Sequence, residues 1–453
     1  MAGGALIFGG VVGLLNMAAR AKANKEACKA LQLANENALI ESANNRAVFC
    51  TNTYIGTANP ALPYSTAETL LLTDGSGGQH FQNVTQKASV NLLTSGTSQR
   101  LRNKALTYFC YDALANGKAV VIVHCDNQDL QQQLKKGPAG KRYLAVDGHS
   151  YKYDPFVNMA SRGIASLMFE AIPEKYRAPY SSKLLIQVVA ELRRQAGGQI
   201  SLKQLASSPI HDLIRVMDKH YNNGKLSDTT YNTLRSDYVS AQNDAGTLRA
   251  YLDELDRQLS DMFSQKNSKP LDFEKAIKGC YMISINISSQ ENDLVVAVIT
   301  EHLRELFRTK RNIALVLDGI NIHPDNKLVK LLQKNQSCHF AISSEDAYAA
   351  LGARKDEVNA LLGGDCRLVL FRHGNQSSCE FWSEYFGEYE RVEILESFNE
   401  GQRNLLSPAD MTRGWSPNKT KERKLLPDVF MKLTDRQFCA YDAATGQTIL
   451  GEI

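Results

Sequence analysis

The sequence predicts an α/β fold in which a parallel sheet carries an all-α insertion and is preceded by an N-terminal apolar helix. Three observations support this prediction. Short β-branched and apolar runs such as 119–123 and 313–317 are typical of buried parallel strands, and they alternate with segments of helical spacing. Between the early and the late runs, residues 164–275 show helical patterns throughout. The residues at the start of the chain, 2–19, carry no charge.

The length and composition are those of a globular protein. A chain of 453 residues suits two or three structural units. Apolar residues make up 43% and charged residues 22%, so large-scale disorder is not expected. The net charge of +4 is small for this length and does not by itself call for nucleic acid or an acidic substrate. The nine cysteines form no CxxC pair or tight Cys/His cluster, which predicts free thiols in a reducing compartment and no metal site.

The charge-free segment 2–19 predicts a membrane anchor. A spanning helix needs about 20 apolar residues, and this segment lies at the short end of the working range. Arg20, Lys22 and Lys25 follow it at once, and by the positive-inside rule they place the bulk of the chain in the cytoplasm. A signal peptide carries its positive charge before the apolar run, whereas here the charge follows it, so an anchor is favoured over a signal peptide. The alternative is an N-terminal helix that docks on the protein itself.

The next elements lead into the sheet. Residues 22–45 are rich in Ala, Leu, Asn and Glu and predict a helix. Residues 51–80 contain much Gly, Pro, Thr and Ser, so an irregular segment is expected there. A strand–helix–strand unit follows, made of the apolar run 88–93, the polar turn 94–98, the helical pattern 101–114 and the β-branched run 119–123.

Strand signals return after the helical insertion. Strand-like runs occur at 280–285, 313–318, 340–343 and 367–371, and helical patterns lie between them at 293–308, 327–334 and 346–352. The sequence therefore predicts five units: a membrane helix at 1–21, an N-terminal helix and linker at 22–80, the first part of the sheet domain at 81–163, the all-α insertion at 164–275, and the second part with a C-terminal tail at 276–453.

The turn after the first strand stands where a phosphate-binding loop would stand. The pattern GxxxxGK[ST] uses glycines so that backbone N–H groups approach phosphates, a lysine for the β- and γ-oxygens, and a hydroxyl for magnesium. The corresponding positions here are Thr94, Ser95, Gly96, Thr97, Ser98, Gln99, Arg100 and Leu101. Arg100 keeps a positive charge, but Gln99 replaces the last glycine and Leu101 replaces the hydroxyl. The alternative is an ordinary polar turn between a strand and a helix.

The run 313–318 has the form of a Walker B strand, because it is apolar and ends in an acid. That acid, Asp318, would help to hold magnesium. Gly319 stands where a glutamate usually positions the attacking water. Many α/β strands end in Asp before a turn, so a purely structural role for Asp318 is the alternative.

The order of these pieces resembles that of the type IV coupling proteins, which are P-loop ATPases of conjugation and type IV secretion. The resemblance covers about residues 80–453, mostly by order and hydrophobic pattern, with local similarity at 116–126, 153–158, 271–277, 350–352, 362–367 and 425–433. It implies a P-loop (RecA-like) parallel sheet with an all-α insertion. It also implies a homo- or hetero-oligomer that passes substrate to a secretion channel.

Three departures from the family pattern imply that hydrolysis is lost. Gln99-Arg100-Leu101 replaces Gly-Lys-Ser/Thr, and Asp318-Gly319 replaces Asp-Glu. The glutamine that the family usually carries after the next strand is replaced near Ser343-Ser344. Charge stabilisation and water positioning are removed together. The resemblance then implies a pseudo-ATPase with no catalytic residue and no metal site, in which residues 94–101 and Asp318 would contact any nucleotide. No cofactor is predicted, and weak binding of ATP and Mg²⁺ is left open.

The leading hypothesis is a coupling-protein-like component at a bacterial inner membrane, anchored through residues 2–19. Its partners would be the conjugation or secretion machinery, an active coupling ATPase, and DNA or a relaxase or effector protein. A second hypothesis is a divergent but active ATPase in which Arg100 replaces the lysine and Asp126 or Glu345 activates water. A third is a soluble α/β interaction protein.

Overall fold

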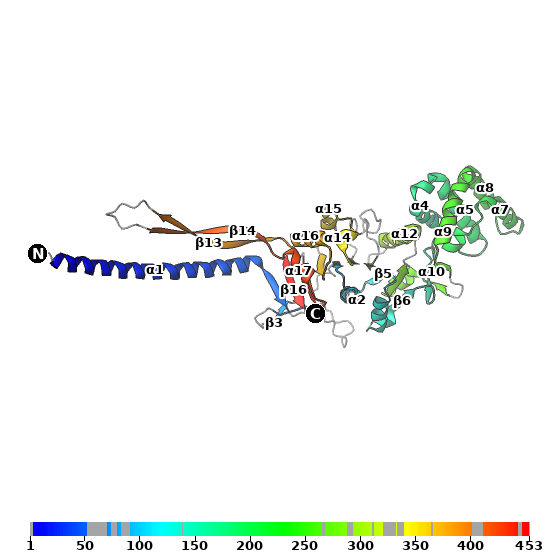
Figure 1. The fold of residues 1–453 in the computed structure, drawn as a ribbon. Coiled ribbons are helices and arrows are strands. Elements are labelled where there is room, and N and C mark those ends of the chain that lie inside the picture. Colours follow the sequence, from blue (N-terminus) through cyan, green and yellow to red (C-terminus); the bar gives the residue numbers. More distant parts are fainter. Residues whose placement is uncertain are drawn as a thin grey trace.

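The fold is built on one sheet of twelve strands, most of them parallel (Figure 1). The computed structural model describes residues 3–51, 70–73, 79–82, 91–137, 139–264, 268–287, 293–309, 312–319, 332, 339–363, 366–400, 411–442 and 446–452. The strand order is β1-β16-β15-β12-β4-β11-β10-β5-β9-β6-β7-β8. The bounds are β1 Val48–Thr51, β4 Asn91–Ser95, β5 Ala119–Cys125, β6 Tyr143–Val146, β7 Tyr151–Lys152, β8 Lys269–Pro270, β9 Met282–Ile287, β10 Ile313–Asp318, β11 His339–Ser344, β12 Cys366–Leu370, β15 Gln437–Asp442 and β16 Gln447–Glu452.

The central strands are the apolar runs that the sequence predicts, and all pairings from β12 to β8 are parallel. They are apolar on both sides because both faces of the sheet are covered. On one face, Val120, Ile122, Ala314 and Val316 pack against helix α2 (Gln99–Ala115). On the other face, Val121, Val123, Leu315 and Leu317 pack in the core of helices α4 (Ser161–Ala171) and α12 (Asp293–Thr309). The α/β prediction with a parallel sheet is therefore confirmed.

The strand–helix–strand unit differs from the simplest expectation in one respect. Strands β4 and β5 are joined through α2, but they are not neighbours, because β11 and β10 lie between them. The chain therefore crosses two strand positions before it returns to the sheet. This spacing leaves room for β11 and β10 to enter beside β4 and to bring their own carboxyl ends to the same edge.

The stretch predicted as an all-α insertion forms a group of helices at one end of the molecule (Figure 1). Besides α4, they are α5 Pro179–Gln195, α6 Leu202–Ala206, α7 Leu213–Asn222, α8 Asp228–Ala241, α9 Ala245–Gln258, α10 Asp261–Ser264 and α11 Phe273–Lys278. The short strand β8 also lies within this stretch and adds to the edge of the sheet. The remaining sheet-covering helices are α3 Gln128–Lys136, α14 Ala347–Ala350, α15 Lys355–Leu362, α16 Gln376–Tyr385 and α17 Pro427–Lys432. The proposed domain boundaries stay predictions.

A stalk projects from the opposite end (Figure 1). It consists of helix α1 (Gly3–Arg46) and a hairpin of strands β13 (Glu388–Glu400) and β14 (Met411–Arg423) beside it. The helix predicted at 22–45 is thus present, and it is continuous with the apolar segment before it. The hairpin was not predicted. In the described part of the chain, no helix combines the length and apolar character needed to cross a bilayer.

The segment 51–80 is not wholly irregular, because β2 (Leu70–Thr73) and β3 (Gln79–Gln82) pair in an antiparallel two-stranded sheet. Both strands are only four residues long and lie in a stretch rich in Gly, Pro, Ser and Thr, which predicts irregular structure. The helix expected at 327–334 lies outside the described residues except for Leu332, which is helical and buried.

Candidate functional site

The candidate site lies at the carboxyl ends of the central strands. Parallel register sets Thr94 of β4 beside Ser343 of β11, Ser343 beside Asp318 of β10, and Asp318 beside His124 of β5. All four side chains are buried. Carboxyl ends of parallel strands are where ligands bind in open α/β sheets. The fold therefore brings the predicted turn and the predicted acid to one edge, with a histidine that the sequence reasoning did not single out.

The eight predicted turn residues are divided between three elements. Thr94 and Ser95 end β4 and are fully buried, and α2 begins with Gln99 and Arg100, which are exposed. Leu101 is buried under the sheet face. Only Gly96, Thr97 and Ser98 form the turn between strand and helix. The turn is therefore short for a loop that must wrap around phosphates.

Two backbone donors of the turn, those of Gly96 and Thr97, are used within the protein. Gly96 N–H donates to the carbonyl oxygen of Ser344 at 3.3 Å, and Thr97 N–H donates to that of Arg372 at 2.9 Å. The Thr97 hydroxyl donates to the same Arg372 oxygen at 3.3 Å. A phosphate cradle needs such N–H groups directed at the ligand. Here the two N–H groups instead hold the turn against Ser344 at the end of β11 and Arg372 just after β12.

Gly96 is needed for packing. Its φ is +141°, and a Cβ on it would lie 2.6 Å from Cβ and 2.9 Å from the carbonyl carbon of Phe371. Residues with a side chain rarely adopt this φ, and a backbone carbon atom at this distance cannot move aside easily. The glycine thus lets the turn approach the end of β12, which accounts for it without a phosphate.

Arg102, which was not among the predicted site residues, reaches the space between the turn and the acid strand. Its guanidinium donates to the Gly96 carbonyl oxygen, and its Nε donates to Ser343 Oγ at 3.3 Å. Burial lowers its pKa, and the carboxylates of Asp318 and Glu345 act in the opposite direction. Arg100, predicted in the lysine position, is exposed instead. One signal could have found Arg102: it falls on the same helical face as the buried Leu101, Ala105 and Leu106.

Asp318 is held by an amide network. Its Oδ2 accepts a 2.5 Å hydrogen bond from Asn127 Nδ2, and Asn127 exchanges two further bonds with Asn103, at 3.0 and 2.7 Å. Asn127 also accepts from Leu130 N–H and so begins α3. Among the described residues, Asp318 Oδ1 has no hydrogen-bond partner. The Asp318 carboxylate as a whole acts to raise the pKa of Arg102.

His124 is the next buried titratable group along this edge. Its Nε2 lies 2.9 Å from Ser284 Oγ and from Gln131 Nε2, and its Nδ1 accepts from Asn127 N–H at 3.2 Å. Burial lowers its pKa to about 4, although Asp318 and Asp126 act to raise it. The ring is therefore neutral near pH 7 and serves to position Asn127.

The acids considered for an active enzyme lie at the border of this site. Asp126 is exposed and pairs with Asn286, whose side chain donates to its Oδ1 at 3.2 Å and accepts from its N–H at 2.8 Å. Glu345 is exposed as well. Gly319, in the glutamate position, has φ +66°, a backbone region that favours glycine. A glutamate there would be strained.

The site does not fit Mg²⁺. That ion prefers six oxygen ligands in near-octahedral geometry. Asp318 offers one unpartnered oxygen, the hydroxyl position is the buried Leu101, and the guanidinium of Arg102 is a competing cation. Within the described ranges, no group of three or more His, Cys, Asp or Glu residues is placed to hold a metal ion.

Comparison with known proteins gives the fold. No protein-family model matches the sequence, and no curated protein matches it either. The unbound monoclinic form of the bacterial conjugative coupling protein TrwB is similar in structure, with a TM-score of 0.53, 14% identity, and coverage of 89% of this chain and 92% of that chain. VirB4 of Thermoanaerobacter pseudethanolicus is more distant, with a TM-score of 0.47, 12% identity, and coverage of 86% and 97%. The coupling-protein resemblance predicted from the sequence is confirmed at the level of the fold.

Proposed function

We propose, from the fold that this chain shares with the conjugative coupling protein TrwB, that it is a coupling-protein-like component of a conjugation or type IV secretion machine. We further propose that it does not hydrolyse nucleotide. The observation that carries the second part is Arg102, whose guanidinium bonds to Gly96 and Ser343 and lies in the field of Asp318. The guanidinium of Arg102 thus lies between the turn at Gly96 and the strand that ends in Asp318, where a nucleotide's phosphates and metal ion would bind.

Each catalytic requirement of phosphoryl transfer is weakened by a specific feature. Positioning of phosphates needs free backbone donors, and those of Gly96 and Thr97 are bonded to the carbonyl oxygens of Ser344 and Arg372. Charge stabilisation needs a cation aimed at the phosphates, and Arg100 is exposed at the start of α2. Water positioning needs a glutamate after Asp318, and Gly319 has a backbone conformation that disfavours one.

Membrane anchoring is the part of the proposal that rests on the N-terminal segment. Residues 2–19 carry no charge, and from residue 3 they belong to the same helix that continues to Arg46. In this proposal the anchor lies in a bacterial inner membrane, with the bulk of the chain in the cytoplasm. The helical insertion and the sheet edges then recruit an active coupling ATPase and a substrate, either DNA or a relaxase or effector protein. Side-by-side assembly of copies, or of this chain with the active motor, belongs to the same proposal.

Equilibrium dialysis of the full chain against ATP, with and without Mg²⁺, tests this assignment. We expect any retention of ATP to be weak, and equal in wild type and in Asp318→Ala, because the carboxylate is engaged with Asn127. Tight retention of ATP that requires both Mg²⁺ and Asp318 would refute the proposal that Arg102 and Asn127 occupy the groups a nucleotide would need.

A divergent but active ATPase is the second candidate. The observation that favours it is Asp318 Oδ1, a buried oxygen without a hydrogen-bond partner in the described part of the chain. A rearrangement that moved Arg102 outward would leave this oxygen for a metal ion. The discriminating result is Mg²⁺-dependent turnover that disappears in Asp318→Ala.

A further inference from the structure

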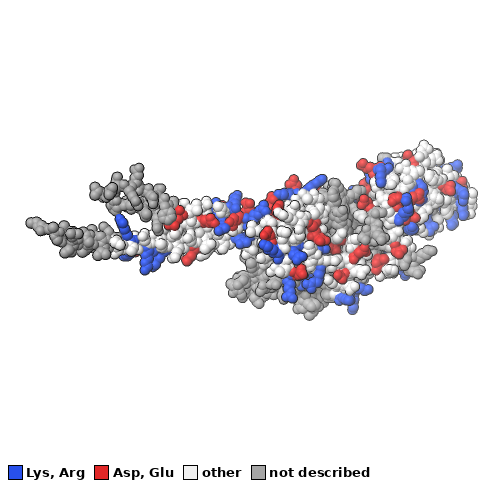
Figure 2. Space-filling model, viewed as in Figure 1, with Lys and Arg blue, Asp and Glu red and all other residues white. Residues whose placement is uncertain are grey.

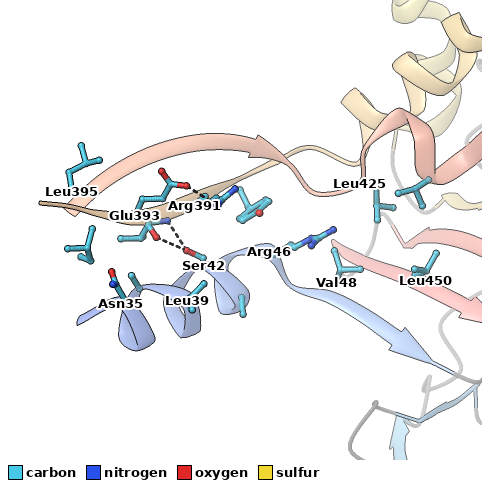
Figure 3. Close-up of a pocket in the computed structure, with 16 residues that line it drawn as sticks. Asn35, Leu39, Ser42, Arg46, Val48, Arg391, Glu393, Leu395, Leu425 and Leu450 are labelled. Atoms are coloured by element: carbon cyan, nitrogen blue, oxygen red, sulfur yellow. Dashed lines mark hydrogen bonds and ion pairs between the residues drawn. The ribbon is translucent and has the colours of Figure 1, made fainter. Parts of the chain in front are cut away.

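At the base of the stalk, hydrogen bonds join helix α1 to strand β13. Ser42 Oγ of α1 donates to the backbone carbonyl oxygen of Val392 at 3.3 Å and accepts from Val392 N–H at 2.7 Å (Figure 3). Asn45 Nδ2 donates to the carbonyl oxygen of Glu390 at 3.2 Å. These bonds pair backbone groups of Glu390 and Val392 on the outer edge of β13, which would otherwise be an open strand edge at that point. The helix and the hairpin are therefore held in a defined register.

That register determines which residue of α1 lies level with the end of the hairpin strands. From Val392 to the end of β13 at Glu400 there are eight residue steps, which correspond to about 26 Å of strand. The same length along α1, counted from Ser42 toward the N-terminus at 1.5 Å per residue, ends about 17 to 18 residues away, near Lys25. The strands of the hairpin thus end level with the segment that follows the charge-free run.

This segment is basic. Arg20, Lys22, Lys25 and Lys29 are all exposed, and the described residues provide no ion pair to any of them. Figure 2 shows Lys and Arg side chains of α1 at this level of the stalk. Nearer the base, two basic side chains are paired with acids: Lys419 with Glu390 at 3.1 Å, and Arg391 with Glu422 at 2.7 Å. The four basic residues therefore follow directly after the uncharged segment 2–19.

The packing of α1 decides its orientation. Among residues 17–46 of α1, those partly or fully buried are Ala27, Leu31, Ala34, Ala38 and Ser42, which recur at three- and four-residue spacing and form one stripe. Ser42 places this stripe against β13. At 100° per residue, Lys22, Lys25 and Lys29 lie on the opposite side of the helix. Arg20 lies on the side of the stripe, nearer the N-terminus than the level at which the hairpin strands end. A helix lying flat on a bilayer needs an apolar face opposite its charges, and here the hairpin covers that face.

We infer that Arg20, Lys22, Lys25 and Lys29 form a basic collar that binds anionic phospholipid headgroups, with the stalk upright on the membrane. This inference rests on the proposed anchor at residues 2–19. Each basic residue held near an anionic surface strengthens binding several-fold, and salt weakens the effect. Arg20 and Arg46 are 26 residues apart, so the helix holds the sheet domain about 39 Å from the headgroups.

Flotation of the full chain with lipid vesicles tests the collar. Vesicles of phosphatidylcholine alone are compared with vesicles that also contain phosphatidylglycerol, at low and high salt. We expect the variant Arg20→Gln/Lys22→Gln/Lys25→Gln/Lys29→Gln to lose roughly 10- to 100-fold in partitioning to the anionic vesicles at low salt. Its partitioning to phosphatidylcholine should be unchanged, because the apolar segment is intact.

The matched control removes four exposed basic residues from the helical insertion, which lies at the far end of the molecule (Figure 1): Lys183→Gln/Arg215→Gln/Lys219→Gln/Lys225→Gln. It should partition like wild type. Equal losses in the two variants would reduce the effect to net charge and overturn the collar. Equal wild-type binding to both kinds of vesicle would also overturn it while leaving the anchor in place. Failure to bind either kind would remove the anchor itself.

A depth measurement tests the upright stalk. A fluorophore placed at Asn24 should be quenched by headgroup-labelled lipid, whereas one at Asn44 should not, because 20 residues of helix separate the two by about 30 Å. Both positions are exposed. Equal quenching at the two positions would show a helix lying along the surface and would refute the upright arrangement.

Discussion

Asn127 donates its side-chain amide to Asp318 Oδ2 across 2.5 Å, and this bond decides what the acid at the end of β10 can do. Asn127 is itself fixed by Asn103 and by its position at the start of α3. The carboxylate is thereby part of a buried amide network. In a working nucleotide site the same carboxylate would hold a magnesium ion through water or directly. Here it stabilises the fold.

Replacing Asn127 with Ala should destabilise the protein by about 2–3 kcal/mol. The change leaves a buried carboxylate oxygen and the Asn103 amide without their partner, and it removes the first bond of α3. Chemical denaturation of the full chain measures the effect. Asn116→Ala, which removes an exposed bond at the end of α2, is the control and should change stability by less than about 1 kcal/mol. Similar losses in the two variants would contradict the network.

Gly96→Ala should be costly for two reasons that can be separated. The new Cβ would overlap Phe371, including its backbone, and the φ of +141° is unfavourable for alanine. We expect a loss of roughly 2–4 kcal/mol in unfolding free energy. Gly117→Ala is the matched control, because its φ is +71° and nothing lies within 4 Å of the added Cβ, so only a strain of about 1 kcal/mol is expected. If both variants lost the same amount, close packing on β12 would not be the reason for Gly96.

Ser42→Ala should loosen the base of the stalk. The Val392 N–H, buried at that point, would lose its acceptor at 2.7 Å. Hydrogen exchange at this amide should become faster by about tenfold, which corresponds to about 1.4 kcal/mol. Exchange within the central strand β10 should not change. The exposed Asn44→Ala on the same helix is the control. Unchanged exchange at Val392 would show that the helix does not protect the strand edge.

Stability should fall in acid through His124. Burial lowers the pKa of this histidine from 6.5 to about 4, so the unfolded chain binds a proton more readily than the folded one. The contribution is complete above about pH 6.5 and is lost as the pH falls toward 4, by on the order of 3 kcal/mol. Asp154 acts oppositely, since burial raises its pKa to about 6. For this reason the measured quantity is the difference between wild type and His124→Gln.

Unfolding of both proteins at several pH values between 7 and 4 provides this comparison. The difference in unfolding free energy should shrink with falling pH. His149→Gln, at an exposed position, should run parallel to wild type. A wild-type curve parallel to that of His124→Gln would mean that the histidine protonates equally well in the folded state.

The sheet could be predicted from the sequence because its strands are covered on both faces. Runs such as Ile313–Asp318 and Ala119–Cys125 are continuous and β-branched, so local pattern and burial agree. The hairpin β13–β14 could not be recognised in the same way. It is exposed on much of its surface, carries charged residues along both strands, and depends on α1 for the cover of one edge. Nothing in its own sequence shows that contact.

The sequence identified the turn and the acid that the fold brings to one sheet edge, but it did not identify the side chains that contact them, and a role for these residues in nucleotide binding stays a prediction. Spacing placed the turn at Gly96 and the acid at Asp318, and register does set their strands at one edge. Arg102 was missed because an arginine in the first turn of a helix is usually exposed, although it shares the helical face of the buried Leu101, Ala105 and Leu106. Asn127 was missed for a similar reason: it lies 191 positions from Asp318, and a single amide carries no motif.

Release of phosphate from ATP by the full chain, in the presence and absence of Mg²⁺, tests the central claim most directly. With Arg102 between Gly96 and Ser343, and Asp318 bonded to Asn127, we predict no release above that of a control without protein, under either condition. Mg²⁺-dependent release that is abolished by Asp318→Ala would contradict the account, because it would show that this carboxylate leaves its amide partner to serve a bound metal ion.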